Sequence, residues 1–191
     1  MALDPAGGVF EPFVVGSAAQ AVGWAAGLDQ IAVDAPDRLS TAPHAGDATL
    51  PGKFREARCA EIALGRQRGI WVPWTTPARA PVAPWMEVGF AVFAGLRALG
   101  RDPFEVYPAG AFWLLSGRRW PARKTTAEGR AARIAILRGL GVAGSALDCW
   151  SHHALDALMA AVVARDRGRG RAIGTGCGHD GSAIWMPAED A

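Results

Sequence analysis

Three acidic residues stand in or directly after short apolar runs of the sequence. Asp34 follows an Ile-Ala-Val run, Glu105 lies in a Phe-Glu-Val-Tyr run, and Asp156 lies in an Ala- and Leu-rich stretch. Carboxylate oxygens are the ligands that Mg²⁺ and Mn²⁺ prefer, and metal ions held by acids suit the hydrolysis of phosphodiesters. If the fold brings the three acids together, we expect Asp34, Glu105 and Asp156 to be the catalytic, metal-binding residues of a phosphodiesterase that acts on nucleic acid.

Two histidines lie close to Asp156 on the same predicted helix. His152 and His153 precede Asp156 by four and three residues, which are spacings that place side chains on one side of a helix. His153 is the stronger candidate for a metal ligand, because a further group beside the acids is otherwise missing and a neutral imidazole binds metal. His44 and His179 stand in predicted loops, and no pattern around them indicates chemistry.

Each acid also has a structural alternative. Asp34 could cap a turn, because a short carboxylate can bind nearby backbone amides. Glu105 could form a salt bridge with an arginine such as Arg58 or Arg130, since a buried carboxylate requires a cation, a metal or a proton. Asp156 could belong to an exposed polar stripe of its helix. Glutamate is a poor strand former, so Glu105 is the most unusual of the three.

An α/β fold would position these acids. Residues 31–33 and 104–107 are short and apolar, which is typical of parallel strands that are buried on both faces of a sheet. Helical spacing and breaker residues predict helices over 18–26, 53–66, 85–99, 109–115, 126–140 and 147–167. Strands that alternate with helices indicate an α/β sheet, whose sites gather at the carboxyl ends of its strands. Asp34 and Glu105 fall at such ends.

Turn and capping residues set further boundaries. A turn over residues 4–8 precedes a predicted strand over 9–15, and Ser17 is a suitable N-cap for the helix that follows. Asp148 or Ser145 could cap the last helix.

Familiar catalytic motifs are missing from the sequence. It has no G-x-S-x-G, no P-loop and no H-E-x-x-H motif. The glycine-rich residues 174–178 follow a helix and an arginine run rather than opening a βαβ unit, which makes them a weak dinucleotide loop. They separate residues 171–173 from 183–186, and these two segments predict a closing hairpin or a loop.

Size and charge restrict the class of protein. A chain of 191 residues, half of them hydrophobic and a fifth charged, can bury the core of a single domain over residues 1–191. A net charge of +2 is weaker than that of a protein that binds nucleic acid over a wide surface. Basic residues still cluster at 118–124 and at 165–171, so local phosphate contacts and plain solvated surfaces both stay open.

Cysteine use and hydrophobicity bear on the compartment. Cys59, Cys149 and Cys177 are widely spaced and form no C-x-x-C pair, which argues against a disulfide framework and against a cysteine-rich zinc site. We expect each cysteine to be a small, buried or half-buried hydrophobe rather than a nucleophile. The sequence shows no secretory signal and no apolar stretch of the roughly 18 residues that cross a bilayer, so we predict a cytoplasmic protein without a membrane span. The sequence does not indicate an oligomeric state.

Several segments, taken in order, resemble one family. They are Ile31-Ala32-Val33-Asp34-Ala35-Pro36, Arg58-Cys59-Ala60-Glu61, Phe104-Glu105-Val106-Tyr107-Pro108, Lys124 through Arg133, Leu155-Asp156-Ala157-Leu158 and Ile184-Trp185-Met186-Pro187. Their order and spacing resemble the domain-of-unknown-function family 429, whose members are predicted nucleases of ribonuclease H-like fold. The resemblance covers about residues 28–187, and its Val33-Asp34-Ala35-Pro36 and Glu105-Val106-Tyr107-Pro108 elements are the most specific together.

The resemblance implies a mixed, five-stranded sheet flanked by helices. By analogy with related nucleases, acids near the middle of the sheet would hold two Mg²⁺ or Mn²⁺ ions, one of which would activate water. Lys124, Arg58 or Arg130 would contact phosphate as point charges or forks.

Two departures from the family bear on activity. Folds of this kind begin with a strand that carries an aspartate and continues into a hairpin, whereas residues 2–8 of this chain fit the turn of that hairpin. We therefore expect the first strand and its acid to be missing, although Asp4 could instead be that acid. Relatives often carry an acid three residues before the aspartate of the last helix, where this chain has His153.

Two other function classes compete with the phosphodiesterase. A catalytically silent binding or scaffold protein would keep the ribonuclease H-like fold while lacking the first acid. Phosphate transfer of the actin and sugar-kinase type shares the core of the fold, but the sequence lacks glycine-rich phosphate loops after strand hairpins.

Overall fold

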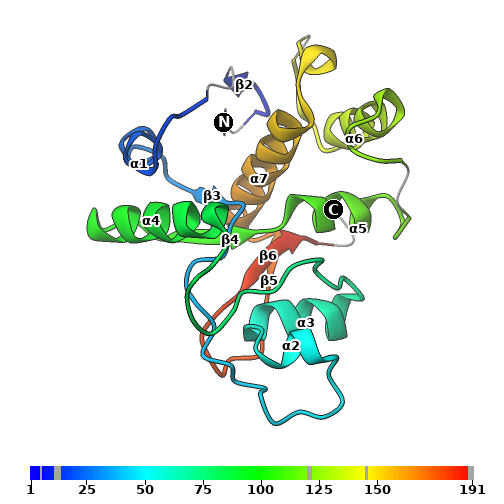
Figure 1. The fold of residues 1–191 in the computed structure, drawn as a ribbon. Coiled ribbons are helices and arrows are strands. Elements are labelled where there is room, and N and C mark those ends of the chain that lie inside the picture. Colours follow the sequence, from blue (N-terminus) through cyan, green and yellow to red (C-terminus); the bar gives the residue numbers. More distant parts are fainter. Residues whose placement is uncertain (5, 11–13, 120–121, 145, 189–191) are drawn as a thin grey trace. The chain divides into compact units, whose positions relative to one another are not determined.

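The computed structural model describes residues 1–4, 6–10, 14–119, 122–144 and 146–188 (Figure 1). Its strands are β1 (Ala2–Leu3), β2 (Val9–Phe10), β3 (Ile31–Val33), β4 (Pro103–Val106), β5 (Ala172–Thr175) and β6 (Ile184–Pro187). Its helices are α1 (Ala18–Ala25), α2 (Gly52–Arg55), α3 (Cys59–Arg68), α4 (Pro84–Ala98), α5 (Pro108–Leu115), α6 (Ala127–Gly139) and α7 (His152–Gly168), with a 3-10 helix at Leu147–Cys149. No helix in the described part of the chain is long and apolar enough to span a membrane.

The four later strands form one sheet in the order β3-β4-β6-β5. β4 pairs in parallel with both β3 and β6, so Glu105 has Val33 as its neighbour on one side and Ile184 on the other. β5 and β6 are adjacent, as a closing hairpin requires. The predicted α/β class is confirmed, and a mixed four-stranded sheet flanked by helices is compatible with a ribonuclease H-like arrangement.

The chain divides into two compact units. The Arg58 unit comprises Val15–Val106 and Gly174–Trp185, and the Lys124 unit comprises Met1–Val14, Tyr107–Ile173 and Met186–Ala191. The prediction of one domain over the whole chain stays a prediction.

In the Arg58 unit, α1 and α4 pack against each other and α4 contacts β4 (Figure 1). Gly89 allows α4 to lie against the segment after β3, since a Cβ at this position would overlap the side chain of Ala35. Asp34, at the end of β3, is therefore next to a segment that the helix holds in place. The core at this end of the unit contains the buried side chains of Ala25, Ile31 and Leu96.

In the Lys124 unit, α5, α6 and α7 pack against one another. At the start of α6 the chain needs a glycine, because a Cβ on Gly129 would overlap the carbonyl oxygen of Arg123. The segment before α6 is thus held against the first turn of the helix. The apolar stripe of α7 is buried as its helical spacing predicts, at Leu155, Leu158, Met159, Val162 and Val163.

The single helix predicted over residues 53–66 is wrong. α2 ends at Arg55 and α3 begins at Cys59. Arg58 between them is extended, and its amide donates to the side chain of Glu61 in a capping arrangement. The helix is interrupted because the Arg58 side chain is fully buried and binds acids in the interior.

The last helix begins later than predicted. α7 starts at His152 and its N-cap is Ser151, whose hydroxyl accepts a hydrogen bond from the amide three residues further on. Residues 147–149 form a separate 3-10 helix, so Asp148 does not cap α7. Ser145, the other predicted cap, lies outside the described residues.

The turn predicted over residues 2–8 is wrong for residues 2–3, which form strand β1, and the chain turns between β1 and β2. β1 and β2 pair antiparallel in a separate sheet, and the Gly8 amide donates to Asp4 Oδ1 at 2.8 Å between them. The strand predicted over 9–15 is formed at 9–10, while 11–13 lie outside the described residues. Where the family implies five strands, the main sheet of the described part has four.

Candidate functional site

β3 and β4 carry two of the predicted site acids to neighbouring positions. Val33 pairs with Glu105, so Asp34 follows one residue beyond that register position. Asp34 is exposed, whereas Glu105 is only 3 % exposed. Both acids lie near the carboxyl ends of parallel strands, the place where the sequence pattern predicts a site.

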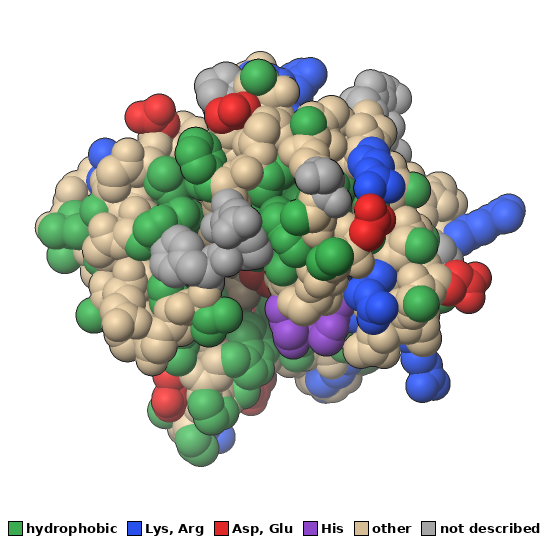
Figure 2. Space-filling view, turned by 90° about the horizontal axis from the view of Figure 1, so that it is seen from above, with side chains coloured by type: hydrophobic (Ala, Val, Ile, Leu, Met, Phe, Trp, Pro, Cys, Tyr) green, Lys and Arg blue, Asp and Glu red, His purple; other side chains and the backbone are tan. Residues whose placement is uncertain are grey.

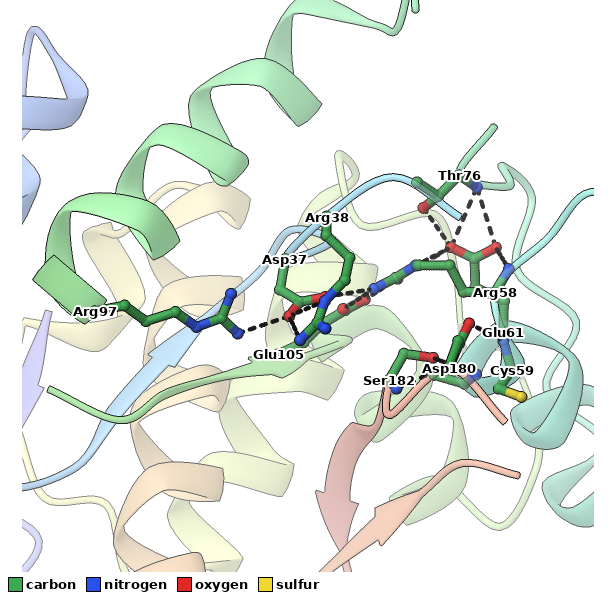
Figure 3. A network of polar contacts seen from close by, with 11 residues as sticks. Asp37, Arg38, Arg58, Cys59, Glu61, Thr76, Arg97, Glu105, Asp180 and Ser182 are labelled. Carbon is green, nitrogen blue, oxygen red and sulfur yellow. Dashed lines mark hydrogen bonds and ion pairs between the residues drawn. The ribbon is translucent and has the colours of Figure 1, made fainter. Parts of the chain in front are cut away.

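Arg58 binds Glu105 through both oxygens of the carboxylate (Figure 3). Arg58 Nη1 donates to Glu105 Oε2 at 2.6 Å, and Nη2 donates to Oε1 at 2.7 Å. Such a forked pair combines charge with fixed geometry. The structural alternative for Glu105, a salt bridge to an arginine, is therefore present.

Further acids surround the same guanidinium. Arg58 Nε and Nη2 donate to Glu61 Oε1 at 3.1 and 3.0 Å, and Nη1 lies 3.2 Å from Asp37 Oδ1. Glu61 in turn accepts hydrogen bonds from the amide and the hydroxyl of Thr76. All donors of the Arg58 side chain are thus used within the protein.

Asp37 extends these contacts to the surface. Its Oδ2 accepts from Arg97 at 2.6 Å and from Arg38 at 2.5 Å. Three carboxylates therefore meet three arginines, and their formal charges cancel. We call this group the Arg58 network: Asp37, Arg38, Arg58, Glu61, Thr76, Arg97 and Glu105.

The electrostatics at the centre of the Arg58 network are set by burial and by ion pairing. Burial raises the pKa of Glu105 to about 7, although Arg58 opposes this shift. Burial alone would lower the pKa of Arg58, but Glu105 and Glu61 hold it above its usual value. Because both oxygens of Glu105 already accept from Arg58, this acid does not fit the role of a Mg²⁺ or Mn²⁺ ligand in the structure.

The same geometry weighs against the prediction that Arg58 contacts phosphate. Its side chain has no exposed surface, and a phosphate on a ligand would have to displace Glu105 or Glu61 to reach it. Arg58 therefore has a structural role.

Asp156, the third predicted acid, lies on α7 in the Lys124 unit. It is 6 % exposed, and its Oδ2 accepts from Lys124 Nζ at 2.6 Å. Its Oδ1 is buried and has no hydrogen-bond partner within the described part of the chain. The meeting of Asp156 with Asp34 and Glu105 stays a prediction.

A cavity of about 450 Å³ lies beside the start of α6. Thr126 caps this helix, because its Oγ1 accepts from the Gly129 amide at 3.0 Å and donates to the Arg123 carbonyl at 2.9 Å. The cap fixes the backbone of the lining segment. We call this cavity the α6 pocket, which is lined by Ala109, Ala122, Arg123, Lys124, Thr125 and Arg133.

The α6 pocket is electropositive. Arg123, Lys124 and Arg133 line it, and Asp156 is the acid that pairs with one of them. Arg133 is buried with its guanidinium 5.1 Å from the centre of the Phe112 ring, and its Nε has no acceptor among the described residues. An anion would supply both the missing charge and the missing acceptor.

The other predicted ligands lie in the same unit. His153 is exposed in the first turn of α7, with 4.0 Å between the centres of its ring and the His152 ring. The pKa of His152 is lowered by burial and by the charges of His153 and Lys124, which is consistent with a positive environment. Arg130 donates to the carbonyl of Thr125 at 3.2 Å and so braces the segment that lines the pocket.

Several side chains of the Arg58 network and of the α6 pocket were not among the predicted site residues. Glu61 had a signal, since it follows Arg58 at the three-residue spacing of a helix-start capping pair. Asp37 and Arg133 were not singled out by a local pattern, because Arg58 and Arg97, which bind Asp37, and Asp156, which attracts Arg133, come from distant segments of the chain.

The prediction that each cysteine is a separate, buried or half-buried hydrophobe is wrong, because two cysteines are joined in a disulfide and the third is exposed. Cys59 and Cys177 form a disulfide bond across 118 residues of sequence. His44 Nε2 lies 3.2 Å from Cys177 Sγ, and the rings of His44 and His179 are stacked with 5.3 Å between their centres. Cys149 is a free, exposed cysteine. Sequence spacing did not reveal that Cys59 and Cys177 lie beside the two histidines, because only the fold brings these segments together.

A family model described as "Protein of unknown function (DUF429)" matches residues 2–176 of the chain. The match includes the Arg58 network and the α6 pocket and ends one residue before Cys177. No curated protein and no solved structure matches the chain.

Proposed function

The chain belongs to the DUF429 family, and we propose that it binds the phosphate groups of a nucleic acid in the α6 pocket. The observation that carries this proposal is the excess of positive charge there. Among the residues that the structure describes, Arg123, Lys124 and Arg133 line the cavity and Asp156 is the acid that pairs with one of them, which leaves two positive charges unmatched there. Glu128, in the first turn of α6, is exposed and does not line the pocket.

Three features of the α6 pocket favour a phosphate oxygen. Lys124 provides a point charge, and Arg133 provides a buried Nε–H that has no acceptor in the described part of the chain. The start of α6 adds the positive end of the helix dipole. These groups hold phosphate in many nucleic-acid complexes.

The proposed contact is local rather than spread over a broad surface. The net charge of the chain is only +2. On the face that Figure 2 shows, Lys and Arg side chains are interspersed with acidic and uncharged ones. We therefore propose that a few phosphates are bound, not a long stretch of backbone.

Fluorescence anisotropy with a short, labelled single-stranded DNA tests the proposal. Contacts with two or three phosphates predict a slope of log K against log salt of about −1.4 to −2. Lys124→Ala should weaken binding about tenfold, or about 1.4 kcal/mol. Arg138→Ala, at the other end of α6 and paired with Asp148, is the matched control and should bind like the wild type. Equal affinities of the two variants would contradict the assignment of the pocket.

A second candidate function is the metal-dependent phosphodiesterase, with Mg²⁺ or Mn²⁺ held by Asp34, Glu105 and Asp156. One observation favours it: the buried Asp156 Oδ1 lacks a partner among the described residues and so leaves an oxygen for a cation. The pairing of Glu105 with Arg58 and of Asp156 with Lys124 weighs against it. We therefore place phosphate binding without hydrolysis first, which is the function of a catalytically silent member of this fold.

A nuclease assay with added Mn²⁺ separates the two candidates. A hydrolase should cleave the DNA only when metal is present, and Asp156→Asn should abolish that cleavage. A binding protein should retain the DNA while wild type and variant show the same background cleavage. Metal-dependent cleavage by the wild type alone would replace the first candidate with the second.

The cytoplasmic location predicted from the sequence is part of this proposal. In that compartment nucleic acid is accessible and cysteines are kept reduced. A fluorescent fusion protein found outside the cytoplasm would overturn the proposed location.

A further inference from the structure

Four side chains of the Arg58 unit place soft metal ligands at one point. The ligand atoms of His44, Cys59, Cys177 and His179 all lie within 4.8 Å of one another. His44 Nε2 is 3.2 Å from Cys177 Sγ and 3.6 Å from Cys59 Sγ. Two sulfurs and two imidazole nitrogens are a donor set of tetrahedral Zn²⁺ sites.

Three segments of the chain hold these side chains. Cys59 is the first residue of α3, His44 lies between β3 and α2, and the other two ligands lie between β5 and β6. Asp180 joins two of the segments, since its Oδ2 accepts from the Cys59 amide at 3.0 Å (Figure 3). The loop that carries Cys177 is thus fixed to the helix start.

Ser182 makes a second connection between the same segments. Its Oγ accepts from the Ala60 amide at 3.0 Å and donates to Asp180 Oδ1 at 2.6 Å. The first amides of α3 are therefore bound by the ligand-bearing loop. The helix N-terminus also favours negative charge on a thiolate at Cys59.

We propose that His44, Cys59, Cys177 and His179 bind one Zn²⁺ ion when the Cys59–Cys177 disulfide is reduced. Two thiolates and two neutral imidazoles balance the charge of the ion and complete four-coordination. A disulfide by itself requires no imidazoles around it, so the two histidines are the part of this cluster that a purely structural bond leaves unexplained. Thiolate and imidazole donors select zinc over Mg²⁺ or Ca²⁺.

Zinc binding and the disulfide exclude each other. Reduction by a dithiol breaks the S–S bond: two electrons pass to the sulfurs of Cys59 and Cys177, the two protons of the dithiol go to the new thiols, and the dithiol becomes a disulfide. Zn²⁺ then displaces both thiol protons as it binds. The two sulfurs must move apart to about 3.7 Å, the ligand separation in a tetrahedral site with Zn–S of about 2.3 Å.

The inference is independent of phosphate binding in the α6 pocket. The cluster belongs to the Arg58 unit. Two of its ligands, Cys177 and His179, lie beyond residue 176, where the family match ends. Metal binding therefore tests a property argued from this chain alone.

Titration with Co²⁺, a spectroscopic substitute for zinc, tests the site in the full-length protein. After reduction by a phosphine without oxygen, the wild type should bind one Co²⁺ per chain, with tetrahedral d–d bands and a thiolate-to-cobalt charge-transfer band that Zn²⁺ removes. The oxidised protein should show neither band. His44→Ala and His179→Ala should each weaken binding more than about tenfold, the effect of losing even an outer partner of a metal ligand.

A matched control is available elsewhere in the chain. Cys149→Ser removes the free, exposed cysteine and should bind Co²⁺ like the wild type. The histidine variants keep both cysteines, and circular dichroism of their oxidised forms checks the fold. The proposal is overturned if the reduced wild type binds no Co²⁺, or if His44→Ala and His179→Ala both bind it as tightly as Cys149→Ser. If reduction alone loosens the fold, Zn²⁺ must restore the native spectrum, and failure to do so also overturns it.

Discussion

The Arg58 network and the α6 pocket use the same kinds of side chain in opposite proportions. In the network three carboxylates surround three arginines, and Arg58, Glu61 and Glu105 are almost completely buried. In the pocket three cations face one aspartate beside a cavity of about 450 Å³. Buried charges that are matched within the protein leave no group for a ligand, whereas unmatched charge beside a cavity attracts one.

Glu105 and Asp156 show why the Arg58 network and the α6 pocket differ. Glu105 and Asp156 both stand in apolar stretches of the sequence, are buried and pair with a cation. Both oxygens of Glu105 are used by Arg58, but one oxygen of Asp156 lacks a partner among the described residues. The number of acceptors left over, rather than the acid itself, distinguishes a structural carboxylate from a candidate for chemistry.

The largest effect should come from removing the cation at the centre of the network. Arg58→Met leaves Glu61 and Glu105 buried without their shared partner. Breaking a buried ion pair by removing one partner typically costs 3–5 kcal/mol. We expect the free energy of unfolding, measured by urea denaturation, to fall by about that amount.

Arg138→Ala is the control for this substitution. The Arg138–Asp148 pair lies at the surface, with side chains 51 % and 64 % exposed. Such pairs contribute about 0–1 kcal/mol, so the variant should stay within about 0.5 kcal/mol of the wild type. A similar small loss for Arg58→Met would mean that the network contributes no more to stability than a surface pair.

The second effect is the dependence of the free energy of unfolding on pH, which Glu105 should cause. The folded-state pKa of Glu105, about 7, lies above the ordinary value of 4.5. The folded state therefore holds this proton more tightly, so the stabilisation is complete below about pH 4.5 and is lost as pH rises through about 7. The loss amounts to at most about 3 kcal/mol.

Comparison with Glu105→Gln isolates this contribution. The difference in unfolding free energy between wild type and variant, measured by urea denaturation from pH 5 to pH 8, should shift against the wild type as pH rises. A difference that shifted in favour of the wild type would show that attraction to Arg58 outweighs burial.

Local patterns predicted the elements better than they predicted the partners. The strand at residues 31–33 and the cap at Ser17 follow from apolarity and hydrogen-bonding chemistry over a few residues, and both are found. The helix predicted over 53–66 fails at Arg58, because a long-range ion pair outweighs the local helical tendency there.

The predictions of site residues show the same difference between local patterns and distant partners. The sequence predicted Glu105 to be a buried acid, because a charge in an apolar run needs compensation, and it is buried. For Asp156 the sequence left an exposed polar stripe open, and the structure shows it buried as well. It offered Arg58 as a partner of Glu105 but gave no means of choosing between that role and a phosphate contact. The approach of Cys59 to Cys177 depends on tertiary structure alone and left no periodic trace.

The third effect concerns the negative charge of Asp156 in the α6 pocket. Asp156→Asn removes the acid of the α6 pocket and frees Lys124. If the pocket binds phosphate, DNA affinity should rise between three- and tenfold, or about 1 kcal/mol, because one negative charge beside the ligand is lost. Anisotropy titrations at one fixed salt concentration measure the change. Weaker binding by the variant would mean that Asp156 serves the ligand directly, as a metal-bridged site requires.

The smallest effect separates stability from binding at the start of α6. Thr126→Ala removes the N-cap that holds the segment lining the pocket, and Ser151→Ala removes the equivalent cap of α7. Each loss should lower the free energy of unfolding by about 1 kcal/mol. Only Thr126→Ala should also weaken DNA binding, because Thr126 Oγ1 fixes the Arg123 carbonyl next to Lys124. If both variants kept full affinity in anisotropy titrations, the geometry of the α6 N-terminus would have no part in binding, and the pocket would act through its lysine and arginines alone.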